Sequence, residues 1–337
     1  MRRDVDGASS PEMFLTAVAY ELGEDEHGLD ELTGVDAEVT QALRDGGLDT
    51  YRTTERSVVE LATGPVHRTV EALSDEERGG IRRLLFASNS MWDESLHTAG
   101  ALSVLLRDLG IPDVVPVGAS LSWCANFHVA LELARLFIQD GEECVLVICA
   151  DLWPKGRADR LVSPRISVHS DAGASFAVST HGGPFRVGRT CVRLDPALGS
   201  LDRNAQLVEY MEGVTRGVTG TVGDALGTDL TPEEIARVVP NNYSRWTCRA
   251  IAQLAGFDES KLYLDNVPRF GHALCADNPI NLRDMADSDG VGAGDHLLLL
   301  GTGPYQWGAS VLEATRSTDP AASSAEADRR AAVPALS

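Results

Sequence analysis

The sequence predicts an α/β protein of two similar halves, with mixed sheets sandwiched between helices. Two observations predict this class. Strand-like and helix-like segments alternate along the chain, and the order of the first half returns in related form in the second. The composition, 43% hydrophobic and 23% charged, is ordinary for a globular protein, and 337 residues suit one large domain built from two halves. We therefore expect an N-terminal half over residues 12–183 and a C-terminal half over residues 184–316.

Hydrophobic patterning places the elements of the first half. Pro65 is expected to kink or divide its helix, and Gly110 is expected to close the next one. The elements, in order, are a strand at 13–22, short helical material through 36–47, a helix at 57–73, a strand at 81–90, a helix at 96–110, a strand at 113–120, a helix from 124 to 141, and strands at 144–151 and 174–180.

The second half follows a related order and ends in a hairpin. Its elements are a strand at 185–195, a long helix at 204–227, a strand at 235–242, helices at 244–256 and 278–290, and hairpin strands at 296–303 and 306–315. Because α/β proteins place their sites at the carboxyl ends of strands, two corners stand out, one in each half. They hold Cys124 and Asn241.

The two ends of the chain carry no structural signal. Residues 1–11 and 317–337 lack periodicity, and we expect both to be disordered. The opening "MRRDVDGASSPE" has two arginines but no apolar stretch of a secretory signal, and the longest apolar runs are too short to span a bilayer. A cytoplasmic protein is the expectation.

The net charge and the cysteine pattern limit the classes of ligand that the protein is expected to bind. A formal net charge of −21 argues against nucleic acid, because phosphate binding depends on Lys and Arg. The six cysteines show no C-x-x-C spacing and no accompanying His cluster, so we expect reduced core thiols and no metal. An anionic ligand would need a local basic patch. The clearest is "KGRADRLVSPR", residues 155–165, although a solvated loop is the commoner explanation of such a segment.

Cys124 has the local setting of a nucleophile. In "SLSWCANFHVALELARLF" it stands where a turn of small residues becomes an amphipathic helix. The positive end of a helix favours a thiolate. A buried core cysteine is the alternative, since free Cys is among the most buried residue types. Position alone does not decide between the two.

Five segments together resemble the motifs of ketoacyl synthase III-like enzymes of the thiolase fold, in the right order and over roughly residues 12 to 314. They are "VGASLSWCANFHVALELA", "ISVHSDAGASFAVS", "VVPNNYSRWTCRAIAQLAG", "GHALCADNPINL" and "LLLLGTGPYQWGASVLE". The resemblance implies a thiolase-like fold, a layered α-β-α-β-α sandwich of two halves. It also implies a divergent branch that includes acyltransferases and priming enzymes of specialised metabolism, such as that of polyketides.

The site residues implied by the resemblance depart from the family pattern. The usual triad is Cys, His and Asn; here Cys124 matches the nucleophile, but the usual His position reads Asn241 and the usual Asn position reads His272. His272 would be the general acid or base, and the Asn241 amide with the Gly303 backbone N–H would stabilise the oxyanion. The alternatives are a satisfied loop histidine at 272 and a helix cap at 241.

Four further residues have two possible roles each. Asp277 would orient the imidazole of a catalytic His272, or it would only cap the helix that follows. Trp123 and Phe127 flank the cysteine and would shape an acyl pocket, although core packing explains them equally well. His128 is expected to pack rather than bind a ligand.

The basic segment follows the strand after the nucleophile helix, where similar enzymes contact the nucleotide of coenzyme A. Arg160 and Arg165 are therefore candidates for phosphate contact. The resemblance implies no permanently bound cofactor. The acyl carrier would be coenzyme A or the phosphopantetheine of an acyl carrier protein, and the protein would be a homodimer.

The leading hypothesis is a thioester-dependent acyltransferase. An acyl group would move from acyl-CoA or an acyl carrier protein to Cys124 and then to a second substrate, a hydroxyl, an amine or a carbon nucleophile. Two alternatives stay open. One is decarboxylative condensation with a malonyl carrier protein, as in a priming β-ketoacyl synthase III. The other is a catalytically degenerate subunit that supports another synthase.

Overall fold

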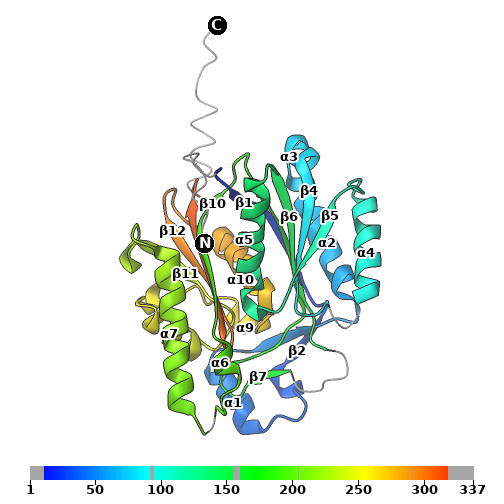
Figure 1. Ribbon diagram of the computed structural model, residues 1–337. Helices are drawn as coiled ribbons and strands as arrows, with labels where there is room; N and C mark the ends of the chain where they lie inside the picture. Colours follow the sequence, from blue (N-terminus) through cyan, green and yellow to red (C-terminus); the bar gives the residue numbers. More distant parts are fainter. Residues whose placement is uncertain (1–10, 92–94, 155–159, 204, 289, 318–337) are drawn as a thin grey trace.

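A computed structural model describes residues 11–317, apart from 92–94, 155–159, 204 and 289 (Figure 1). The ends expected to be disordered therefore lie almost wholly outside the described residues. The same is true of Lys155 and Arg157 in the basic segment.

Each helix and strand expected from the pattern is present, with ends shifted by a few residues. The first half contains β1 (Phe14–Leu22), β2 (Asp25–Gly28), α1 (Ala37–Asp45), β3 (Thr50–Thr53), α2 (Val58–Ala72), α3 (Asp75–Gly80), β4 (Ile81–Ala87), α4 (Ser95–Asp108), β5 (Val115–Ala119), α5 (Asn126–Gln139), β6 (Cys144–Asp151), β7 (Leu161–Ser163), β8 (Ser167–Val168) and β9 (Ala172–Ser179). The second contains β10 (Phe185–Leu194), α6 (Pro196–Gly199), α7 (Leu207–Leu226), β11 (Ile235–Val239), α8 (Arg245–Leu254), α9 (Val267–Phe270), α10 (Asp277–Ser288), β12 (His296–Thr302) and β13 (Gln306–Ala314). The hairpin β2–β3 and the small pair β7–β8 were not expected from the pattern.

The strands of both halves join into one nine-stranded sheet, in the order β11-β12-β13-β10-β1-β9-β6-β4-β5. The junction between the halves is narrow. β1 and β10 pair over two residue pairs, Phe14 with Arg186 and Leu15 with Phe185, whereas β1 follows β9 along most of its length. The sheet therefore consists of two mixed parts that meet at this short seam.

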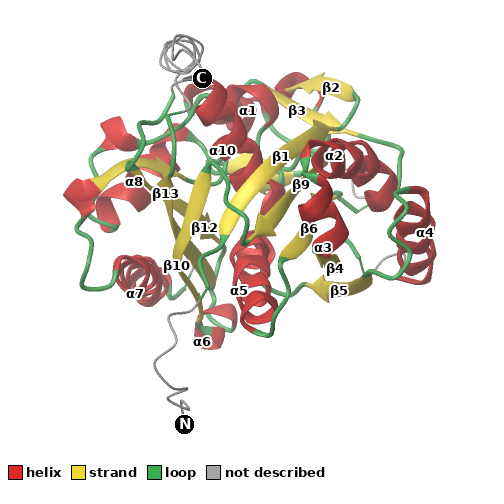
Figure 2. Cartoon of the chain, turned by 90° about the horizontal axis from the view of Figure 1, so that it is seen from above, coloured by secondary structure: helices red, strands yellow, loops and turns green. Residues whose placement is uncertain are grey.

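Helices form three layers around the two parts of the sheet (Figures 1 and 2). α5 and α10 lie between the parts and contact strands of both. α2 and α4 cover the far side of the N-terminal part, and α7 covers that of the C-terminal part. The predicted α-β-α-β-α sandwich is confirmed.

Burial on both faces explains the continuous apolar run of β6. Every residue from Cys144 to Asp151 is buried, because α2 packs on one side of the strand and α5 on the other. Of the two effects expected of Pro65, division of the helix is wrong: α2 is a single helix with Pro65 inside it and buried. Ser57 caps that helix and, with Glu60, forms a reciprocal capping box, which supports its first turn.

Among the described residues, no helix is both long enough and apolar enough to cross a bilayer.

Candidate active site

Cys124 stands at the mouth of α5, the central buried helix. The chain reaches it through a tight turn in which Leu121 and Trp123 have positive φ, 75° and 49°, a conformation that costs free energy for bulky residues. Cys124 lies in the short 3₁₀ turn Trp123–Ala125 that opens the helix, with 3% of its surface exposed. Its N–H is one of the first of the helix, which have no partner within the helix.

His272 is held beside α5 by a glycine and a strand-like contact. Gly271 has φ +60°, and a Cβ there would lie 2.7 Å from the carbonyl oxygen of Val168. The backbone of His272 donates to Val168 at 2.8 Å and accepts from Ser170 at 2.9 Å. The small-residue segment after β8 therefore positions the imidazole-bearing loop.

Cys124, His272 and Asp277 form one hydrogen-bonded chain. The sulfur of Cys124 lies 3.2 Å from Nε2 of His272, and Nδ1 of the same ring donates to Oδ2 of Asp277 at 2.5 Å. Asp277 also accepts from the backbone of Ala273 at 2.7 Å and of Asn242 at 2.8 Å. With Nδ1 bound to a carboxylate, Nε2 is the nitrogen that faces the thiol. This is the nucleophile, base and orienting-acid arrangement of acyl-transfer enzymes.

The charges of this chain favour the protonated imidazole. Burial opposes protonation of His272, but the negative charge of the Cys124 thiolate and then that of Asp277 outweigh it and raise its pKa to about 10. An imidazolium beside the sulfur in turn stabilises the thiolate. The resting site is thus suited to an ion pair.

Tyr243 is the second side chain at the sulfur besides His272, and sequence reasoning missed it. Its hydroxyl lies 3.5 Å from Sγ of Cys124 and donates to the carbonyl oxygen of Thr302, and its ring packs 4.8 Å from the His272 ring. The available signal was a tyrosine where similar enzymes have Ala in their Pro-His-Gln-Ala-Asn motif, two residues after Asn241.

Asn241 and Gly303 do not have the expected roles. The Asn241 side chain accepts from the Thr302 backbone at 2.8 Å and donates to the Leu274 carbonyl at 3.4 Å, so its amide joins two loops instead of facing the sulfur. The Gly303 N–H donates to the carbonyl of Gln306 at 2.7 Å within the β12–β13 turn. Both oxyanion donors expected from the resemblance are therefore used inside the fold.

The two candidate phosphate ligands differ in availability. Arg160 is held in a bidentate pair with Asp171, at 2.9 and 3.1 Å, and 15% of its side chain is exposed. This guanidinium is committed to the fold, which corrects the expected contact with coenzyme A. Arg165 is exposed, and its carbonyl accepts from Ser244, which caps α8. Arg165 remains open to a ligand.

The two aromatic residues near Cys124 differ in how much of their surface is exposed. Phe127 is fully buried and packs with Phe176, ring centroids 5.5 Å apart, in the central core. Trp123 is 41% exposed beside the nucleophile.

His128 is buried one turn into α5. Its Nδ1 lies 2.8 Å from Ser310 Oγ, and burial lowers its pKa to about 3. It packs, as expected.

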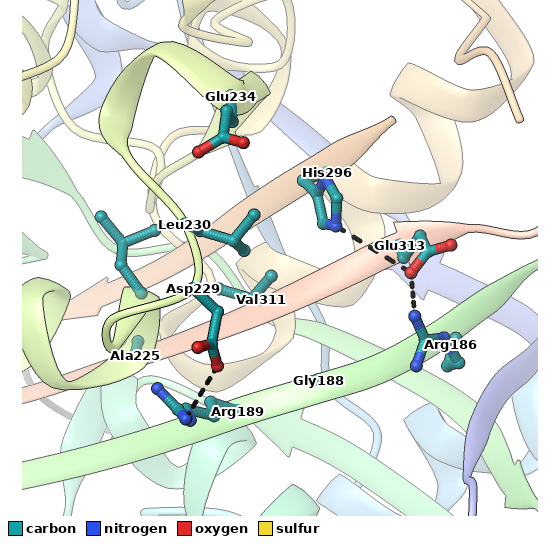
Figure 3. Close-up of a pocket in the computed structure, with 11 residues that line it drawn as sticks. Arg186, Gly188, Arg189, Ala225, Asp229, Leu230, Glu234, His296, Val311 and Glu313 are labelled. Atoms are coloured by element: carbon teal, nitrogen blue, oxygen red, sulfur yellow. Dashed lines mark hydrogen bonds and ion pairs between the residues drawn. The ribbon is translucent and has the colours of Figure 1, made fainter. Parts of the chain in front are cut away.

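A cavity of about 480 Å³ lies away from this chain of residues, between the end of α7 and strands β10, β12 and β13 (Figure 3). Five of its charged or titratable groups pair with one another: Arg189 with Asp229 at 3.0 Å, and Glu313 with both Arg186 and His296. The sixth, Glu234, accepts from the backbone of Thr231 at 2.8 Å. These charged groups therefore already have partners in the fold, and the nucleophile is not among the lining residues.

Comparison with known proteins finds similarity to the enzymes that the sequence resembles. The domain described as 3-oxoacyl-acyl-carrier-protein (ACP) synthase III, C terminal, matches residues 227–314. β-Ketoacyl-acyl-carrier-protein synthase III of Chlorobium phaeobacteroides is 24% identical over 227 residues, which cover 57% of this chain and 68% of the relative. The enzyme of the same name from Chlorobium chlorochromatii is 25% identical over 250 residues, 62% of this chain and 71% of the relative.

Solved structures show the same fold over nearly the whole chain. The acyltransferase ChlB3 superposes with a TM-score of 0.76 at 21% identity, covering 91% of this chain and 98% of ChlB3. The priming β-ketosynthase of the R1128 polyketide biosynthetic pathway gives 0.72 at 16% identity, with 92% and 99% covered. Synthase III of Aquifex aeolicus gives 0.71 at 17% identity, with 89% and 99% covered. The chain therefore has the thiolase fold of ketoacyl synthase III-like enzymes, and its residues 227–314 match their C-terminal domain.

Proposed function

We propose that this protein is an acyltransferase that carries an acyl group on Cys124 from a thioester donor to a hydroxyl or amine acceptor. The observation that carries the proposal is the hydrogen-bonded chain of Cys124, His272 and Asp277. A carboxylate that orients an imidazole makes the imidazole a general base, which an acceptor O–H or N–H needs and a malonyl carboxylate does not.

The first step loads the nucleophile. The thiol proton passes to Nε2 of His272, and the thiolate of Cys124 attacks the thioester carbonyl. A C–S bond to the enzyme forms, the C–S bond to the carrier breaks, and the carrier thiolate takes the proton from the imidazolium. Asp277 stabilises the imidazolium while it exists.

Acylation changes the base. The charge of the free Cys124 thiolate is the strongest contribution that raises the pKa of His272, and it disappears when the sulfur is acylated. The pKa of His272 then falls, and the neutral ring can accept the acceptor's proton. The acceptor attacks the acyl carbon, the acyl–sulfur bond breaks, and Cys124 leaves as the thiolate that re-forms the ion pair.

The carrier is proposed to be coenzyme A or the phosphopantetheine of an acyl carrier protein. Arg165, exposed beside the start of α8, is the proposed contact for a carrier phosphate, with Arg160 excluded by its pairing with Asp171. We also propose that the protein acts as a homodimer in specialised metabolism. The likeness of the fold to an acyltransferase and to a priming ketosynthase supports this setting.

The test is to incubate the protein with a panel of acyl-CoA and acyl carrier protein thioesters and weigh it intact. We expect an acyl adduct on the wild type and none on Cys124→Ala. Addition of alcohol or amine acceptors to the isolated adduct should then release ester or amide. An equal adduct on Cys124→Ala, or none on the wild type with any donor, contradicts the proposal.

A second measurement separates transfer from condensation. Carboxyl-labelled malonyl thioester is supplied to the acylated protein, and released carbon dioxide is counted. Transfer predicts no release above the Cys124→Ala background. Release together with a β-keto product would overturn hydroxyl or amine transfer in favour of decarboxylative condensation.

A further inference from the structure

Tyr243 contacts the reacting sulfur from an element that the proposed mechanism has not used. In the part of the chain that the structure describes, two polar side-chain atoms lie within hydrogen-bond distance of Sγ of Cys124: Nε2 of His272 at 3.2 Å and the Tyr243 hydroxyl at 3.5 Å. Tyr243 comes from the corner between β11 and α8, where it is buried. At this distance the Tyr243 hydroxyl can take part in the reaction at the sulfur.

The position of the tyrosine proton follows from its partners. Burial, with the charge of Cys124 next, holds the pKa of Tyr243 well above its usual value of 10, so the hydroxyl keeps its single proton. The Thr302 carbonyl can only accept, and the hydroxyl donates to it in the free protein. A rotation of the O–H about its bond to the ring is enough to turn this donor towards a new acceptor.

The tetrahedral intermediate on Cys124 would supply such an acceptor. Attack on a carbonyl creates an oxyanion on the carbon bonded to sulfur, and acyl-transfer sites stabilise it with hydrogen-bond donors already in place. The Asn241 amide and the Gly303 N–H are used within the fold, and Nε2 of His272 is occupied with proton transfer. Of the two described side-chain groups at the sulfur, the Tyr243 hydroxyl is the one that can turn its proton towards the oxyanion.

We infer that the Tyr243 hydroxyl is a catalytic hydrogen-bond donor to the oxyanion that forms on the acyl carbon at Cys124. The inference rests on the proposed acyl-cysteine chemistry. In each half-reaction the hydroxyl turns from the Thr302 carbonyl to the oxyanion as it forms and returns when the intermediate collapses. The proton stays on Tyr243 throughout, and the oxyanion regains its carbonyl double bond as the leaving group departs.

The experiment compares two reactions of the same thiol in the Tyr243→Phe variant, which removes the hydroxyl and keeps the ring. p-Nitrophenyl acetate acetylates Cys124 through a tetrahedral intermediate and releases p-nitrophenolate. Iodoacetamide alkylates the same thiolate by direct displacement, with no oxyanion. Both rates are measured in single turnover, with the Cys124→Ala background subtracted.

An oxyanion donor affects one reaction and spares the other. We expect acetylation of Tyr243→Phe to slow by about 100-fold or more, the range for loss of one such donor, while alkylation stays within about twofold of the wild type. Equal slowing of both reactions would mean that Tyr243 acts on the thiolate or on His272, and no slowing of acetylation would mean that it takes no part. Either result overturns the inference.

Two controls keep the result decisive. Tyr20→Phe removes a partly buried tyrosine hydroxyl away from Cys124, one that donates to Asp284 at 2.8 Å, and should change neither rate. If Tyr243→Phe does not fold, 3-fluorotyrosine at position 243 retains the hydroxyl as a stronger donor. Faster acetylation with unchanged alkylation then supports the inference, and unchanged acetylation contradicts it.

The design separates this inference from the proposed function. p-Nitrophenyl acetate needs no natural carrier, so the role of Tyr243 is tested even if no acyl thioester loads the protein. Failure of thioester loading counts against the acyltransferase alone. A normal acetylation rate in Tyr243→Phe counts against the tyrosine alone.

Discussion

At the scale of the residue, one carboxylate connects the loops that make up the site. Asp277 is buried, and its two oxygens accept from the His272 ring and from the backbones of Ala273 and Asn242. Asn242 follows β11 and Ala273 follows His272, so Asp277 fixes both the orientation of the imidazole and the corner that carries Tyr243. A buried carboxylate with these donors is satisfied only when all three segments are in place.

Replacement of this carboxylate tests the orientation of the imidazole. In Asp277→Asn the amide nitrogen can face Nδ1, which favours the wrong tautomer and leaves Nε2 protonated. We expect single-turnover acyl transfer to fall by about two to four orders of magnitude. Asp284→Asn, on the same helix and paired with Arg269, is the matched control and should retain the wild-type rate. Retention of activity in Asp277→Asn would show that His272 needs no orienting acid.

The charge on His272 also makes stability depend on pH. Its pKa is raised from 6.5 to about 10, so the folded state holds the proton more tightly than the unfolded chain. The stabilisation is fully present below pH 6.5 and is lost as pH rises towards 10. Urea unfolding of wild type and His272→Gln should therefore show a difference in unfolding free energy that shrinks across this window. A difference that grows with pH would contradict the assigned charge.

At the scale of the element, strained turns present the reacting groups. Among the described residues other than glycine, positive φ occurs at Leu121, Trp123, Leu274 and Ala17. The first two precede the nucleophile and the third follows His272, so most of this backbone strain is concentrated around the site. Strain of this kind persists only where surrounding packing determines it, here by α5 and α10 between the two parts of the sheet.

Gly271 is the glycine on which the His272 loop depends. With φ +60° and the Val168 carbonyl 2.7 Å from any Cβ, Gly271→Ala should lower the free energy of unfolding by about 1–3 kcal/mol and slow Cys124 acylation. Gly223→Ala, in α7 with open space around its Cβ, should instead stabilise by about 0.5–1 kcal/mol. Chemical denaturation of both variants, with acylation rates, checks the pair. A neutral Gly271→Ala would mean that the loop tolerates displacement.

At the scale of the whole molecule, the two edges of the nine-stranded sheet differ. The outer edge of β11 is bridged by Leu262, which pairs with Val238. On the outer edge of β5 no described strand pairs, and Val115 there is 49% exposed. An uncovered edge strand is a template for pairing with another chain. The expected homodimer would use this edge in an isologous contact.

The dimer is tested by placing a like charge on both sides of its two-fold axis. Light scattering should give twice the chain mass of 36.0 kDa for the wild type and the single mass for Val115→Lys. Leu136→Lys, an exposed apolar position near the end of α5, is the control and should stay dimeric. A monomeric wild type would contradict the homodimer. A dimer that Val115→Lys leaves intact would place the dimer contact away from β5.

Local patterning determined much of this protein. Apolar periodicity located the helices and strands, the alternation determined the α/β class, and the small-residue turn before an amphipathic helix singled out Cys124. These features depend on residues close in the chain, so one sequence is enough to reveal them. The hairpin β2–β3 was missed because its strands, such as Asp25–Gly28, are polar and carry no apolar alternation.

Only the tertiary structure decided which groups meet. His272 is 148 residues from Cys124 in the chain, and Tyr243 is 119. Tertiary packing also joined the Asn241 amide to Thr302, 61 residues away in the chain. Over shorter separations of 11 and 5 residues, it paired Arg160 with Asp171 and brought Asp277 to the His272 ring. Sequence spacing limits which partners are possible, but buried polar groups take whichever donors and acceptors the packed elements bring within reach. That choice is made by long-range packing, which no local pattern contains.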